Sequence, residues 1–147
     1  MRAHDDEMAT LTSSVAALAA ALTILSVPSA AHARPAQVGA TVLSTHLTHS
    51  GDPDGSGSAT VRLRPGAGRV CASISWTGID APSAAHIHRA SDGFVLVDLT
   101  GAVTGGSRCV DAPRAVIRRI ALHPRRYYVN VHNATYPAGA VQGTLHR

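Results

Sequence analysis

The sequence contains no lysine, and all 13 of its basic residues are arginine. Aromatic side chains are also scarce, with one Trp, one Phe and three Tyr in 147 residues. Proteins that bind single-stranded nucleic acid need aromatic platforms on which bases stack, and the arginines here are scattered along the chain. We therefore expect no nucleic-acid partner. The formal net charge of +4 suits adhesion to an anionic cell-wall polymer instead.

Common sequence marks of catalysis are missing as well. The sequence has no Gly-x-Ser-x-Gly motif, which would carry a serine nucleophile, and no Gly-rich loop before a helix, which would hold a nucleotide. Residues 52–57 begin like a calcium-binding loop, but Leu63 stands where the bidentate glutamate is required. We assign no catalytic residue and favour a protein that is not an enzyme.

Residues 1–33 have the pattern of a secretory signal peptide, although their first few residues are unusually acidic. No charged residue occurs between Met8 and Ala31, and Ala31-His32-Ala33 is a small-x-small cleavage signature. A retained membrane anchor is the alternative, but the stretch is only weakly hydrophobic and no basic cluster follows it. Cleavage would leave one domain, residues 34–147, with no membrane span. That domain would be secreted, extracellular or associated with the cell wall.

Cysteine is limited to Cys71 and Cys109. In an exported chain, two cysteines most simply form one disulfide bond. Two free buried thiols are the alternative. A metal role is not expected, because neither residue has a cysteine or histidine neighbour at the spacing of metal ligands.

The remaining sequence alternates between apolar and polar residues in short segments separated by Gly- and Pro-rich turns. This period predicts strands over residues 39–47, 58–64, 69–77, 84–88, 94–99, 108–110, 127–132 and 140–145. Val42 is a core candidate in the first of them. One short helix is predicted near residues 113–123, with Asp111 as its N-cap and Pro113 in its first turn. Such a pattern indicates an all-β antiparallel sandwich or barrel.

Three histidines fall on two of the predicted strands. His86 and His88 are two residues apart, so they share one strand face, and His132 ends another strand. If the three rings converge, they could bind copper or zinc, since imidazole suits both metals. The alternative is a structural role, in which the rings hydrogen-bond the backbone and one another around Asn130 and Tyr136.

Four segments of the sequence resemble the CHRD domain, the module named after chordin, and resemble its bacterial members closely. The segments are residues 51–57, 68–71, 84–88 and 127–145. The resemblance extends from about Val38 to Leu145. It implies an immunoglobulin-like β-barrel, partly through a limited similarity of the family to copper-zinc superoxide dismutases.

The resemblance also gives structural roles to several residues near the C-terminus. These residues are Asn130, Tyr136, Pro137, Gly139 and Gly143. No molecular activity follows from the resemblance, and the growth-factor antagonism of chordin does not carry over to a short bacterial protein.

Two functional hypotheses therefore remain from the sequence. The first is a secreted, non-catalytic binding module for an extracellular protein or a cell-wall polymer. The second is a copper- or zinc-binding protein whose histidines are similar to the copper half of the superoxide dismutase site. The bridging and zinc ligands of that enzyme have no visible counterparts, because only His123 lies between His88 and His132 and it adjoins Pro124.

Overall fold

The computed structural model of the protein describes residues 39–147, so the expected signal peptide lies outside the described residues. The strands are β1 (Thr41–His49), β2 (Ser56–Arg64), β3 (Arg69–Thr77), β4 (Ala84–Arg89), β5 (Val95–Asp98), β6 (Cys109–Asp111), β7 (Tyr127–His132) and β8 (Val141–Thr144). A single α-helix of this part of the chain, α1, spans Arg114–Leu122, and short 3-10 turns cover Pro65–Ala67 (η1), Thr100–Ala102 (η2) and Pro124–Arg126 (η3). In residues 39–147, no helix has the length and apolar character that a membrane crossing requires.

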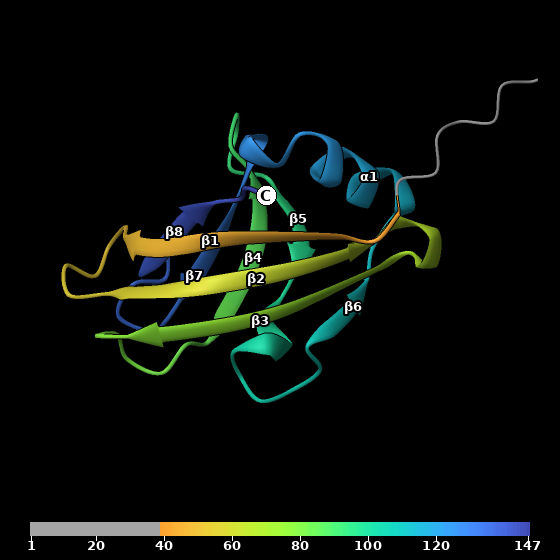
Figure 1. Cartoon of the computed structure of the whole chain (residues 1–147). Coiled ribbons are helices and arrows are strands. Elements are labelled where there is room, and N and C mark those ends of the chain that lie inside the picture. The colour runs from red at the N-terminus through yellow and green to blue at the C-terminus, as the bar shows by residue number, and fades with distance from the viewer. Residues whose placement is uncertain (1–38) are drawn as a thin grey trace, which may run out of the picture. The chain divides into compact units, whose positions relative to one another are not determined.

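The strands form one antiparallel sheet that folds over on itself (Figure 1). Its order is β5-β4-β7-β8-β1-β2-β3-β6. The sheet folds over at β1. This strand pairs with β2 as far as Leu47 and then with β8 through Thr48 and His49. The result is a nearly closed, two-layered β structure, so the predicted all-β sandwich or barrel is confirmed.

The core fills the space between the two layers and follows the period of the strands. In β2, Val61 and Leu63 are fully buried while Arg62 and Arg64 are exposed. Fully buried side chains from the rest of the described chain include Val70, Ile87, Ile117, Ile120, Val129, Val131 and Leu145. Burial of each such side chain favours folding by about 1.5–3 kcal/mol relative to exposure. Alternate residues of the same strands therefore point to the outside of the sheet.

The inward face of β1 differs from the prediction. Val42 is 46% exposed, whereas Leu43 and Leu47 are buried. Because a strand has a period of two, an error of one residue in phase exchanges its two faces. The two leucines bury more apolar area than the single valine, and they determine which face of β1 turns inward.

The helix is present as predicted, but its start is different. Ile117 and Ile120 pack their side chains into the core. Asp111 is not the N-cap, because it is the last residue of β6 and pairs with Arg69 of β3. Pro113 occupies the cap position without a side-chain hydrogen bond, and its restricted φ angle favours the start of a helix.

Cys71 and Cys109 form the predicted disulfide bond. The two residues lie directly opposite each other in β3 and β6, with their Cα atoms 4.0 Å apart. Cys71 lies between the inward-facing Val70 and Ala72, so its side chain lies on the outer face of β3. The bond holds the three-residue edge strand β6 against the sheet.

Candidate metal centre

His86, His88 and His132 come together on the outer face of the sheet. Strands β4 and β7 are neighbours, and Ala84 lies opposite His132 while His86 lies opposite Asn130. His132 is therefore a diagonal neighbour of His86 on the same face, within reach of long side chains. The opposite face of both strands carries the apolar core residues.

The three imidazoles present nitrogen atoms to a common point. One ring nitrogen of each histidine lies within 4.8 Å of the other two, and Nδ1 of His86 is 3.1 Å from Nε2 of His132. Two imidazole nitrogens bound to one ion at 2.0–2.1 Å are separated by roughly 2.9–3.4 Å in square-planar or tetrahedral geometry. Without metal this contact is a hydrogen bond in which Nδ1–H of His86 donates to Nε2 of His132. The same separation would let both nitrogens bind one ion once the His86 proton moves to its Nε2.

In His88 and His132, the ring nitrogen that points away from the common point is held by a backbone carbonyl. Nδ1–H of His88 donates to the carbonyl of Gly93 at 2.8 Å, and Nδ1–H of His132 donates to the carbonyl of Pro137 at 3.0 Å. Carbonyl oxygens only accept, so the proton of each neutral ring sits on Nδ1 and the inward Nε2 keeps its lone pair. Nε2 of His86 lies 3.9 Å from a carboxylate oxygen of Asp98. Hydrogen-bonded carbonyl oxygens typically orient metal-binding histidines, whereas the Asp98 oxygen lies beyond hydrogen-bond distance and acts through its charge.

His88 carries a buried nitrogen without a partner. The residue is 7% exposed, its ring stacks on Tyr128, and its Nε2 has no hydrogen-bond partner within residues 39–147. Leaving a buried polar atom unsatisfied costs about 1–3 kcal/mol. In a purely structural role, His88 would use only Nδ1, which bonds the Gly93 carbonyl. A metal ion would also give Nε2 a partner.

The surroundings keep two of these rings neutral. Burial lowers the pKa of His86, and a charge on His132 lowers it further, while Asp98 opposes the shift. Burial also lowers the pKa of His132, against the hydrogen bond to the Pro137 carbonyl. A neutral imidazole is the form that binds a metal, so both residues are competent ligands at neutral pH.

The loop between β7 and β8 supports the centre through the residues of the family motif. The side-chain amide of Asn130 donates to the carbonyl of Ala138 at 3.1 Å. Gly139 has a φ of +136°, and a Cβ there would lie 2.3 Å from the Asn130 side chain, so only glycine fits. Pro137 supplies the carbonyl that orients His132.

The other two motif residues fix nearby backbone. The backbone N–H of Tyr136 donates to the Asn133 side chain at 2.7 Å, which holds the start of the loop. Gly143 lies in β8, where a Cβ would be 2.1 Å from the carbonyl oxygen of His46. This glycine lets β1 approach β8 closely.

Two supporting residues were not identified from the sequence. Gly93 ends an Asp-Gly turn and has a φ of +68°, and Asp98 is an exposed residue of β5 that lies opposite His86. The Asp-Gly pair is a recognised hairpin signal and could have indicated that this turn folds back over His88. His123 does not join the three-histidine cluster of the described chain and lies exposed after α1.

Comparison with known proteins identifies one family. A CHRD domain model matches residues 35–145. Neither the curated proteins nor the solved structures contain a significant match to this sequence. Because the matched region covers most of the 147 residues, the chain belongs to the CHRD domain family.

Proposed function

We propose that this CHRD domain is an exported, non-catalytic binding module whose His86–His88–His132 centre holds one copper or zinc ion. The observation that carries the proposal is the unsatisfied Nε2 of His88, buried beside two further imidazole nitrogens. Three neutral imidazoles would leave an open position on the ion, which both metals accept. An extracellular protein or an anionic polymer, the other kind of ligand expected from the sequence, would bind elsewhere on the domain.

Metal titration of untagged protein tests the proposal. Protein treated with a chelator and titrated calorimetrically with Cu(II) or Zn(II) should bind one ion per chain, with a Kd tighter than about 10 μM. The Cu(II) form should show nitrogen hyperfine coupling in its electron paramagnetic resonance spectrum. The absence of saturable binding of both metals would end the metal proposal.

Export is supported by the leader pattern of residues 1–33 and by the disulfide, which persists in oxidising compartments. We expect the mature protein to begin at Arg34 and to occur in the culture medium or at the cell wall. N-terminal sequencing of protein from both fractions checks this cleavage position. Recovery of intact Met1 in a cytosolic fraction alone would contradict export.

The metal-free protein should lose stability as the pH falls. The folded-state pKa values of His86 and His132 are lowered, so the unfolded chain binds protons first, near its ordinary histidine pKa of about 6.5. Unfolding then takes up protons, and stability decreases as the pH falls through 6.5 towards the folded pKa values. Melting temperatures measured between pH 8 and pH 5 in the presence of chelator should fall over this range.

A double variant, His86→Gln with His132→Gln, provides the control for that pH series. Glutamine does not titrate, so the variant should show a shallower dependence of melting temperature on pH. Parallel curves for the variant and the parent would show that other groups cause the loss of stability.

A further inference from the structure

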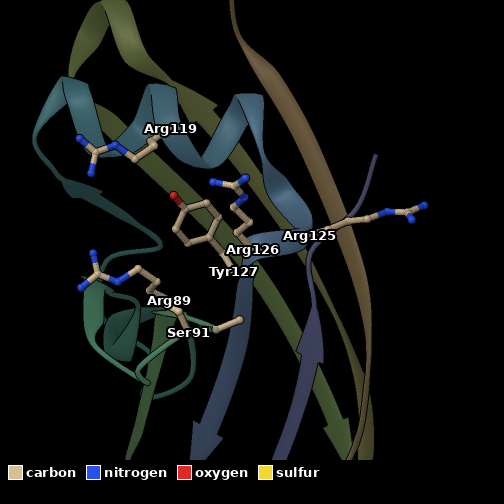
Figure 2. Close-up of a pocket in the computed structure, with 7 residues that line it drawn as sticks. Arg89, Ser91, Arg119, Arg125, Arg126 and Tyr127 are labelled. Atoms are coloured by element: carbon tan, nitrogen blue, oxygen red, sulfur yellow. The ribbon is translucent and has the colours of Figure 1, made fainter.

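A pocket of about 530 Å³ lies where the end of β4 and the start of β7 meet α1 and η3. Its lining includes Arg89, Ser91, Arg119, Arg125, Arg126 and Tyr127 (Figure 2). Tyr127 is in phase with the inward-facing Val129 of β7. The pocket is therefore at an end of the core and is separate from the histidine face.

The pocket has a large excess of positive charge. Arg89 is paired with Asp92, with its Nη2 2.6 Å from a carboxylate oxygen. Within residues 39–147, Arg119, Arg125 and Arg126 have no carboxylate partner. These three residues are exposed, and together they give the cavity a positive potential that attracts anions.

Side chains from several elements surround the Tyr127 ring. Figure 2 shows the guanidinium groups of Arg89, Arg119 and Arg126 on different sides of the Tyr127 ring, whose hydroxyl points into the space between α1 and β4. Arg125 extends away from this space. The donors around the ring therefore come from β4, α1, η3 and β7.

The Tyr127 hydroxyl is a further donor available to a ligand in the pocket. The Tyr127 ring is buried, with the residue 3% exposed, but its hydroxyl is not among the buried polar atoms of residues 39–147 that lack a partner. The hydroxyl therefore opens to the pocket, where it can donate a hydrogen bond to a ligand oxygen.

We infer that this pocket binds a phosphate monoester carried on a group of about the size of a sugar. Donors on several sides match a tetrahedral anion with three free oxygens, whereas a carboxylate offers two oxygens in one plane. Arginine forks bind phosphate in bidentate geometry. The volume is in the range of small-molecule sites and leaves space beside the phosphate for its organic group.

Calorimetric titration of the full domain with glucose 6-phosphate at 150 mM NaCl tests the inference, with inorganic phosphate, glucose and glucuronate as comparison ligands. Glucose 6-phosphate should bind saturably and more tightly than inorganic phosphate, and glucose should not bind. Binding of glucuronate as tight as that of glucose 6-phosphate would overturn the assignment to phosphate. The absence of saturable binding of glucose 6-phosphate up to about 10 mM would overturn the site.

Three variants locate the binding. Arg119→Gln and Arg126→Gln should each weaken binding by roughly tenfold to a hundredfold, the effect of one charge-assisted hydrogen bond. Tyr127→Phe keeps the buried ring and should weaken binding by about threefold to tenfold. Melting curves identify any variant that does not fold. The affinities of the folded variants then show whether the ligand binds in this pocket.

Arg62→Gln is the matched control, because it removes the same charge from an exposed position of β2 outside the pocket. It should leave the affinity unchanged. An equal loss of affinity in this control would show a general effect of net charge and would overturn the site. The inference does not depend on the histidine centre, so metal binding and phosphate binding can fail separately.

Discussion

Removal of the Cys71–Cys109 disulfide is expected to lower the free energy of unfolding by about 3–4 kcal/mol. The bond closes a loop between cysteines that are 38 residues apart, and in the chain-entropy model this restricts the unfolded chain by about that amount. For a domain of this size, the melting temperature should fall by roughly 10–15 °C. The loss should begin at the edge strand β6, which spans only Cys109–Asp111.

The measurement compares oxidised protein with the double variant Cys71→Ser, Cys109→Ser and with protein reduced by dithiothreitol. Both cysteines are partly exposed, so the reductant can reach the bond in the folded protein. The variant and the reduced protein should melt at similar temperatures, both below the oxidised parent. A variant that melts as high as the parent would contradict the stabilising role.

The strands were predictable where the contrast between their two faces is strong. In β2, arginines alternate with buried Val61 and Leu63, and in β7 the predicted bounds agree with the structure. In β1 the contrast is weak, because the apolar residues Val42, Leu43 and Leu47 do not all lie on one face. The assignment of Val42 to the inward face is therefore wrong. Local alternation identifies a strand, but the packing of the other layer decides which face turns inward.

The candidate sites depend on contacts that are distant in the sequence. The shared face of His86 and His88 follows from the strand period alone, but the approach of His132 requires the pairing of Ala84 with His132. The carbonyl partners Gly93 and Pro137 belong to backbone, whose position no side-chain pattern reveals. For these reasons the sequence could only offer a metal centre and a structural role as alternatives.

The arginine pocket depends even more strongly on contacts between residues that are distant in the sequence. The arginines are scattered along the sequence: Arg89 and Arg119 are 30 positions apart in the numbering and belong to different kinds of element. Only the return of β7 beside β4, with Arg89 opposite Tyr127, brings them to one cavity. Net charge is visible in a sequence, whereas the concentration of charge is a property of topology.

Replacing His88 or His132 with alanine is expected to weaken metal binding by more than about a hundredfold. Each change removes one of three ligands, and even the residues that only orient such ligands contribute 10–100-fold to affinity. His123→Ala is the matched control, because His123 is exposed and outside the cluster. Calorimetric titration of the three variants with Cu(II) and Zn(II) measures the difference, and unchanged affinity in His88→Ala would contradict the proposed centre.

Melting curves of the same proteins separate a metal centre from purely structural histidines. Without metal, His132→Ala should destabilise the fold by about 1–3 kcal/mol, because the Pro137 carbonyl and Nδ1 of His86 lose a partner. That loss is expected under either role and does not distinguish them. Metal at about 100 times its Kd should stabilise the parent and His123→Ala by about 2.7 kcal/mol, while His88→Ala and His132→Ala should not respond. If added metal leaves all four melting temperatures unchanged, the three rings have only a structural role, and the buried Nε2 of His88 is a tolerated cost of packing.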